Sequence, residues 1–158
     1  MSTTSKQGNV KVGDYAPNFT LLDQSGEQVS LWDVIGKSAI VLYFYPKDDT
    51  PGCTTEACTF RDSYEAFKDA GAEVIGVSSD SADSHQRFAA KHRLPFILLS
   101  DKDKAVRKLY GVPSTLGLLP GRVTYVIDKK GIVRNIFDSQ FAPQKHITEA
   151  LETLQKLG

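Results

Sequence analysis

The chain has 158 residues, 41% of them apolar, which is enough for one domain with a sizeable core. Its formal net charge is zero, so no overall charge attracts nucleic acid or an anionic membrane surface, and the longest apolar run, residues 39–45, is far too short to cross a bilayer. The two cysteines are too few for a disulfide scaffold, so we expect them to act, if at all, through their chemistry.

The first half of the chain predicts a β-hairpin, a buried strand and a long helix. The stretch "SAIVLYFY" is continuously apolar rather than alternating, which is typical of a strand buried on both faces. Beyond it, Ala57, Phe60, Tyr64 and Phe67 recur at spacings of three or four, as on one face of a helix. The expected elements are a polar tail (1–10), two short strands around a turn (17–31), one helical turn (31–36), the buried strand (38–45) and the helix (50–69).

The second half alternates strands with helices and then ends on a hairpin and an amphipathic helix. Ser81 is a plausible N-cap, and Ile147, Leu151 and Leu154 mark the inward face of the last helix. The expected elements are strands at 72–80 and 96–101, helices at 81–94 and 104–111, a hairpin at 122–137 turning at 128–131, and a closing helix at 142–158.

This order of elements predicts a single α/β domain over residues 1–158. Strand–helix–strand units imply parallel pairing with right-handed crossovers, and the late hairpin adds antiparallel strands. We therefore expect a thioredoxin-like fold with a central mixed sheet flanked by helices and an N-terminal hairpin extension. Another small doubly wound fold is the alternative.

Both cysteines lie in "PKDDTPGCTTEACTF", directly after the buried strand. Thr50 is a good N-cap and Pro51 suits the first helical position, so Cys53 falls in the first turn of a helix. Unpaired backbone N–H groups and the helix dipole there favour a thiolate over a thiol. The competing interpretation is a small buried thiol that only packs.

Cys58 lies about a turn and a half further along the same helix. Residues five apart in an intact helix have Cα atoms roughly 8–9 Å apart, whereas a disulfide needs about 7 Å or less. Either the two cysteines never bond to each other, or the helix unwinds when they do.

Other chemistry-bearing residues give weaker signals. The three histidines, His85, His92 and His146, are far from the cysteines in sequence, and we expect each at the surface or at the edge of the core. The C-x₄-C spacing is only marginal for zinc. Arg122 opens a strand, and its position alone favours an ordinary surface arginine.

The residues "PKDDTPGC" fit the pattern Pro-x-x-x-Thr-x-x-Cys and resemble the active-site motif of the peroxiredoxins, the thiol peroxidases. The continuation "TPGCTTEACTFRD" is similar to the peroxiredoxin Q subgroup, also called bacterioferritin comigratory protein, and "YFYPKDDTPGCTTEAC" to its cyanobacterial and chloroplast members. The likeness runs from "VGDYAPNFTLLDQSG" through "GRVTYVIDKKG" to "KHITEALETL". It implies a cytoplasmic protein, or a chloroplast protein if a transit peptide has been removed.

The resemblance also implies roles for individual residues. Cys53 corresponds to the peroxidatic cysteine and Cys58 to the resolving cysteine, which would form a redox disulfide with it. Thr50 would hydrogen-bond the thiolate and the peroxide, Pro46 would shield the pocket, and Arg122 would complete the site. In the same comparison, Glu56 would orient this arginine.

The implied activity is that of an atypical 2-Cys, thioredoxin-dependent peroxidase that needs no metal or organic cofactor. Its expected substrates are hydrogen peroxide and alkyl hydroperoxides, and its reductant is thioredoxin or a similar dithiol. We expect a monomer without nucleic-acid or membrane partners. A thiol–disulfide oxidoreductase is the second hypothesis, against which the missing C-x-x-C motif speaks, and a redox-sensing module is the third. Peroxide consumption discriminates among them.

Overall fold

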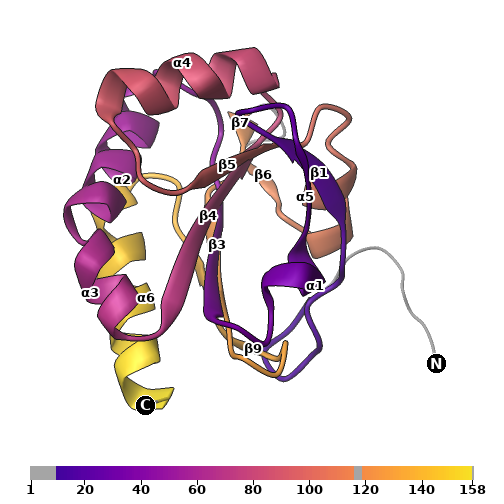
Figure 1. Ribbon diagram of the computed structural model, residues 1–158, viewed down its shortest axis with the longest axis vertical. Helices are drawn as coiled ribbons and strands as arrows, with labels where there is room; N and C mark the ends of the chain where they lie inside the picture. Colours follow the sequence, from indigo (N-terminus) through magenta and orange to yellow (C-terminus); the bar gives the residue numbers. More distant parts are fainter. Residues whose placement is uncertain (1–9, 116–118, 158) are drawn as a thin grey trace.

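The computed structural model describes residues 10–115 and 119–157, which form one seven-stranded mixed sheet with helices on both sides (Figure 1). The predicted polar tail lies outside these residues apart from Val10. The elements are β1 (Thr20–Asp23), β2 (Gln28–Ser30), α1 (Leu31–Val34), β3 (Ala39–Phe44), α2 (Pro51–Asp62), α3 (Tyr64–Asp69), β4 (Ala72–Ser78), α4 (Ala82–His92), β5 (Ile97–Ser100), α5 (Ala105–Tyr110), β6 (Ser114–Thr115), β7 (Leu119–Pro120), β8 (Val123–Ile127), β9 (Val133–Asp138) and α6 (Pro143–Leu157).

The sheet has the strand order β2-β1-β5-β4-β3-β8-β9. Strands β3, β4 and β5 are parallel, whereas β8 and β9 form an antiparallel hairpin that joins β3 on its other side. The N-terminal hairpin extends the sheet through an antiparallel pairing of β1 with β5. The expected thioredoxin-like fold with a mixed sheet is therefore confirmed.

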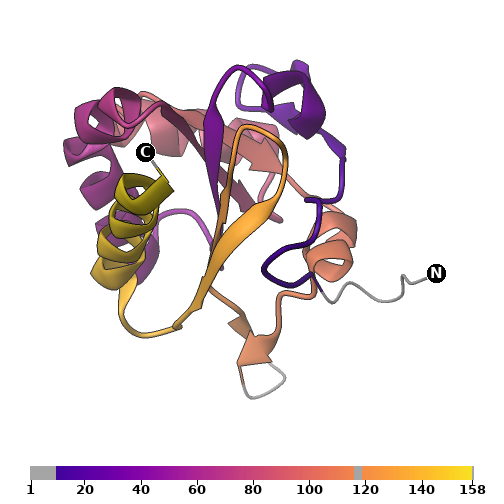
Figure 2. The same cartoon turned by 90° about the horizontal axis from the view of Figure 1, so that it is seen from below.

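Strand β3 lies in the centre and contributes to two cores. Helices α2, α3, α4 and α6 cover one face of the sheet, and α1 and α5 cover the other (Figures 1 and 2). Val41 and Tyr43 point into the first core, while Ile40 and Leu42 point into the second. This two-sided burial explains why the strand has no alternation of polar and apolar residues.

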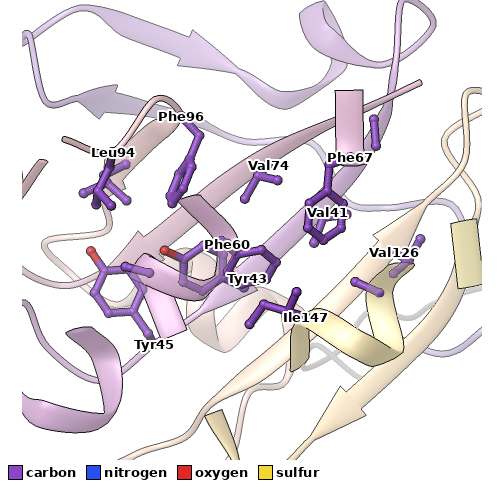
Figure 3. Close-up of a cluster of buried hydrophobic side chains, with 14 of the residues drawn as sticks. Val41, Tyr43, Tyr45, Phe60, Phe67, Val74, Leu94, Phe96, Val126 and Ile147 are labelled. Atoms are coloured by element: carbon purple, nitrogen blue, oxygen red, sulfur yellow. The ribbon is translucent and has the colours of Figure 1, made fainter. Parts of the chain in front are cut away.

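The first core is rich in aromatic side chains. The Tyr43 and Phe60 rings stack with centroids 4.5 Å apart, and Phe67 lies 5.5 Å from Phe60 (Figure 3). Figure 3 also shows Ile147 of α6 beside this group. The predicted inward positions of α2, α3 and α6 are thus confirmed, with Leu151 partly buried.

The expected single helix over residues 50–69 is wrong in one respect. It is broken at Ser63, whose backbone (φ −101°, ψ 8°) leaves the helical region and separates α2 from α3. Serine is a poor helix former because its hydroxyl competes for backbone groups. Phe60 and Phe67 still reach the same core, so the apolar spacing hides the break. The short β6–β7 pair was not predicted.

The carboxyl end of β3 and the amino end of β8 meet at one edge of the sheet. Their antiparallel register pairs Phe44 with Val123, which places the segments carrying Pro46 and Arg122 side by side. Within the two described stretches, no helix is long and apolar enough to cross a bilayer.

Candidate active site

Helix α2 begins at this edge, and Cys53 lies in its first turn as predicted. Thr50 is the N-cap with extended backbone (φ −87°, ψ 155°), and Pro51 follows at the first helical position. The Thr50 side chain makes no capping bond; its hydroxyl donates to the Lys47 carbonyl at 3.0 Å. The first-turn N–H groups near Cys53 therefore keep their capacity to bind a negative charge.

Cys53 is covered almost completely, with 1% of its surface exposed, whereas Cys58 is half-buried. Both are free thiols within the continuous α2 helix. Pro46 lies two residues beyond the end of β3, after Tyr45, and is partly buried. The structure thus places the more protected thiol at the end of α2 that faces the strand ends.

Arg122 is not a surface residue, since only 4% of it is exposed. Its Nη1 donates to Glu56 Oε1 at 2.6 Å, and its Nε donates to the Gln140 carbonyl at 3.1 Å. A Cβ added to Gly52 would come within 2.9 Å of Arg122 Nη2, so the guanidinium lies directly over the first turn of α2. The glycine before Cys53 leaves the space that this close approach requires.

The charges of this pair and the thiol are coupled. Burial alone would lower the pKa of the Arg122 guanidinium, but Glu56 and Cys53 outweigh burial and raise it. Burial raises the pKa of Glu56 to about 8, although Arg122 opposes the shift. Arg122 is therefore held as a cation next to Cys53, which is the arrangement that stabilises a thiolate.

The segment after β9 holds Arg122 from the other side. The Ser139 N–H donates to the Arg122 carbonyl at 3.2 Å, and His146 Nε2 lies 2.8 Å from the Ser139 carbonyl. His146 Nδ1 lies 2.8 Å from the Thr124 hydroxyl and 3.7 Å from Glu56 Oε2. Burial lowers the pKa of His146 to about 4, and Arg122 adds to this effect. The His146 ring is therefore neutral near pH 7. It supports the segments of Thr124 and Ser139, and it carries no positive charge that would compete with Arg122 for Glu56.

A second buried cluster anchors the loop between β3 and α2. The Asp48 carboxylate contacts His85 Nδ1 at 2.7 Å and accepts bonds from Tyr45 and Ser84 at 2.6 and 2.8 Å. Burial alone would raise the pKa of Asp48, but these partners outweigh it and hold the pKa below its ordinary value. The Asp48 N–H donates to Asp80 Oδ2 at 2.7 Å. The loop that carries Pro46 is therefore tied to α4 and to the segment between β4 and α4.

Asp48, Asp80 and His85 each offer one ligand atom, and these atoms lie within 4.8 Å of one another. Distance alone would allow a metal ion. Three of the four carboxylate oxygens, however, already accept hydrogen bonds, from Tyr45, Ser84 and the Asp48 N–H. We assign this cluster to anchoring rather than to metal binding.

The structure brings Cys53, Glu56 and Arg122 together and places Thr50 and Pro46 at the same edge. It corrects the expectation for two histidines, because His85 and His146 are fully buried. Three buried polar residues around the site were not predicted from the sequence. They share one detectable signal, which is their position on the apolar face of a helix. They are His85, three residues before Phe88; His146, four before Ala150; and Arg107, three before Tyr110.

Comparisons with known proteins agree with this geometry. Residues 12–136 match the AhpC/TSA family. The chain is 61% identical to a chloroplastic peroxiredoxin Q of Triticum aestivum over 95% of this chain and 69% of that protein. It is also similar to the crystal structure of the peroxidoxin BcpB of Mycobacterium tuberculosis, with TM-score 0.88 and 37% identity over 95% of this chain and 99% of that one.

A third relative is the Xanthomonas campestris bacterioferritin comigratory protein, whose alkyl peroxide reduction activity has been studied through structures of trapped intermediate and ligand complexes. It matches with TM-score 0.80 and 34% identity over 88% of this chain and 91% of that one. Fold and relatives together define a peroxiredoxin, a thiol-dependent peroxidase. The chain belongs to the AhpC/TSA family. The resemblance to the peroxiredoxin Q subgroup is confirmed.

Proposed function

We propose that Cys53 is the peroxidatic cysteine and that Arg122, Thr50 and Pro46 complete its site. The observation that carries this proposal is the buried Arg122 guanidinium, fixed by Glu56 at 2.6 Å over the helix turn that contains Cys53. A fixed cation and unpaired N–H groups beside a covered thiol stabilise a thiolate, and they also stabilise charge on a departing oxygen.

In the proposed reaction, the Cys53 thiolate attacks one oxygen of the hydroperoxide. The S–O bond forms as the O–O bond breaks, so the sulfur loses two electrons and becomes a sulfenic acid. The other oxygen leaves with the electron pair and takes up a proton, giving water from hydrogen peroxide or an alcohol from an alkyl hydroperoxide. The Thr50 hydroxyl, now bonded to the Lys47 carbonyl, would turn toward the reacting oxygen.

Cys58 then attacks the sulfenic sulfur of Cys53, which forms the disulfide and releases water. A dithiol reductant, for which we propose thioredoxin, attacks this disulfide and leaves with its own disulfide, so that both thiols return. This is the scheme of an atypical 2-Cys peroxidase. The substrates proposed are hydrogen peroxide and alkyl hydroperoxides, the latter in keeping with the activity studied in the Xanthomonas campestris relative.

The deciding experiment is peroxide consumption with thioredoxin as the electron donor, for the wild type and both Cys→Ser variants. Cys53→Ser should abolish the reaction because the nucleophile is gone. Cys58→Ser should consume one equivalent of peroxide and stop at the sulfenic acid. Full single-turnover reaction in Cys53→Ser would refute the assignment, and undiminished thioredoxin-driven turnover in Cys58→Ser would refute its resolving role.

We also propose that the chain acts as a single domain and as a monomer. Among the larger exposed apolar side chains, Tyr15 and Trp32 lie together with ring centroids 6.2 Å apart, whereas Leu22 in β1, Leu109 in α5 and Phe141 before α6 come from separate parts of the fold. Light scattering after gel filtration tests the monomer, and a dimer mass at micromolar concentration would contradict it. The cytoplasmic location stays a prediction, whereas the plant relatives are chloroplastic proteins.

A further inference from the structure

Arg107 is a second buried arginine near the proposed site. It lies in α5 with 6% of its surface exposed, and its guanidinium carbon is 5.9 Å from the centre of the Phe44 ring. Among the described residues, no carboxylate forms an ion pair with it. A buried cation without a paired anion is costly, so its hydrogen bonds and its surroundings must offset that cost.

Both hydrogen bonds of this guanidinium go to backbone carbonyls that border the proposed site. Nη2 donates to the Tyr45 carbonyl at 2.9 Å, and Nη1 donates to the Gly121 carbonyl at 3.0 Å. Tyr45 directly precedes Pro46, and Gly121 directly precedes Arg122. The planar fork of one arginine thus joins the two chain segments that carry residues of the site.

This bridge lies where the sheet no longer joins the two segments. The β3–β8 ladder has its last pair at Phe44 and Val123, one residue short of Tyr45 and Arg122. Beyond that pair the two segments belong to different loops, and Arg107 supplies the next connection between them. Without it, the ladder alone would leave the spacing between Pro46 and Arg122 less well defined.

The bridge itself is rigidly mounted. The Asp101 carboxylate accepts the backbone N–H groups of Val106 and Arg107 at 3.1 and 2.8 Å, which fixes the start of α5. At the other end, a Cβ on Gly121 would collide with the Pro113 carbonyl, so the Gly121 backbone is held closely against the segment that follows α5. A rigid mount is what a positioning element requires.

We propose that Arg107 is a positioning residue of the peroxidase site, which sets the distance between the Pro46 and Arg122 segments. This proposal rests on the proposed roles of Cys53 and Arg122. The role needs the planar fork of arginine, so Arg107→Lys, which keeps the cation without the fork, should lose it as Arg107→Met does.

The test compares Arg107→Lys and Arg107→Met in a Cys58→Ser background, where the reaction stops after one step. The matched control is Arg87→Met, which removes an exposed arginine of α4. Two second-order rate constants are measured at Cys53 by peptide mass spectrometry, one with hydrogen peroxide and one with neutral iodoacetamide. Only the peroxide reaction depends on donors placed around a departing oxygen.

Arg107→Lys should slow the peroxide reaction by about ten-fold, because the Pro46 and Arg122 segments would no longer be held at the right spacing. This effect is smaller than that of removing a donor that touches the peroxide. The iodoacetamide rate of Arg107→Lys should stay within about two-fold of the parent, because that reaction does not depend on donors around a departing oxygen. Arg107→Met should slow the peroxide reaction at least as much, because it removes both hydrogen bonds of the bridge.

The ratio of the peroxide rate to the iodoacetamide rate is the deciding quantity. If this ratio is the same in the Arg107 variants as in Arg87→Met, the positioning role is wrong, even if the Arg107 variants melt at lower temperatures. If Arg107→Met does not fold, Arg107→Lys alone decides the positioning role. Failure of the proposed function itself would appear separately, as peroxide reaction persisting in Cys53→Ser.

Discussion

The two ends of the α2–α3 segment are held by different kinds of contact. The first turns of α2 are fixed by polar groups, since Arg122 lies over Gly52 and bonds Glu56, while Thr55 is exposed. The far end is fixed by aromatic packing, with Phe60 and Phe67 fully buried. The thiol chemistry is therefore placed where the helix depends least on the apolar core.

This difference separates two tasks within one helical segment. Burial of aromatic rings does not depend on the redox state of sulfur, so it keeps α3 and the end of α2 in place. The Arg61 side chain adds a bond from Nη1 to the His92 carbonyl at 2.8 Å, tying the far end to α4. Polar contacts around Cys53 depend on charge and can change when the thiolate is consumed.

The largest expected effect comes from removing the aromatic anchor. Phe60→Ala should lower the free energy of unfolding by about 3–5 kcal/mol, because it deletes a fully buried ring and leaves a cavity. Thr55→Ala, at an exposed position in the first half of α2, should change the free energy of unfolding by less than about 0.5 kcal/mol. Urea unfolding of the reduced proteins measures both changes in the free energy of unfolding. Similar losses in the two variants would contradict the proposed difference between the two ends of the α2–α3 segment.

The next effect concerns the polar end and appears in rate rather than in stability. Arg122→Met should slow oxidation of Cys53 by hydrogen peroxide by about 10²-fold, the loss expected for one donor to a developing oxyanion. Arg122→Lys should restore only part of the rate, because an ammonium lacks the planar fork. Stopped-flow measurement tests this, with Arg134→Met, a partly exposed arginine of β9, as the control. Wild-type rates in both Arg122 variants would remove Arg122 from the site.

Much of this arrangement can be predicted from local sequence. The strand–loop–helix unit that positions Cys53 follows from one apolar run, an N-cap threonine and a proline at the first helical position. The spacing of Phe60 and Phe67 correctly indicates the buried face. These signals are local, because each depends on residues within one or two helical turns.

The rest depends on contacts that no local pattern encodes. Glu56 and Arg122 are 66 residues apart and meet only because β3 and β8 pair in one particular register. The same holds for Arg107, whose partners belong to two other segments. Polar residues on an apolar helix face, such as His85, look like exceptions until the tertiary structure supplies their acceptors.

A smaller effect should follow from His146, which supports the Arg122 segment at the polar end of α2. Burial lowers the pKa of this ring from 6.5 to about 4, so between these pH values the unfolded chain binds a proton that the folded chain does not. Stability should therefore fall as the pH drops from 6.5 towards 4, with a contribution from His146 of about 2 kcal/mol.

His146→Gln can keep bonds to the Thr124 hydroxyl and the Ser139 carbonyl but cannot take up this proton. Its urea-unfolding stability should accordingly decline less than that of the wild type between pH 6.5 and pH 4. His92→Gln, at a partly exposed ring of α4, provides the control and should follow the wild type. Parallel pH profiles for the wild type and His146→Gln would contradict the assignment.

The last prediction concerns what oxidation does to the polar end. Cys53 and Cys58 lie in one continuous helix, where residues five apart are roughly 8–9 Å apart at Cα, beyond the limit of about 7 Å for a disulfide. Forming the bond must therefore unwind the start of α2. Gly52, Thr54 and Thr55 are poor helix formers, so this end can open at small cost. Phe60 and Phe67 should hold the remainder in either redox state.

Oxidised protein should therefore lose part of its helical circular dichroism, and its amides between Cys53 and Arg61 should exchange with solvent at least about ten-fold faster than in the reduced form. The amides of α6 serve as the internal control and should exchange equally in both forms, because that helix takes no part in the disulfide. Cys58→Ser treated with peroxide should keep the reduced pattern, since it cannot close the bond. Equal protection of residues 53–61 in the two redox states would show that the disulfide forms without unwinding, and the division between a releasable polar end and a fixed aromatic end would then be wrong.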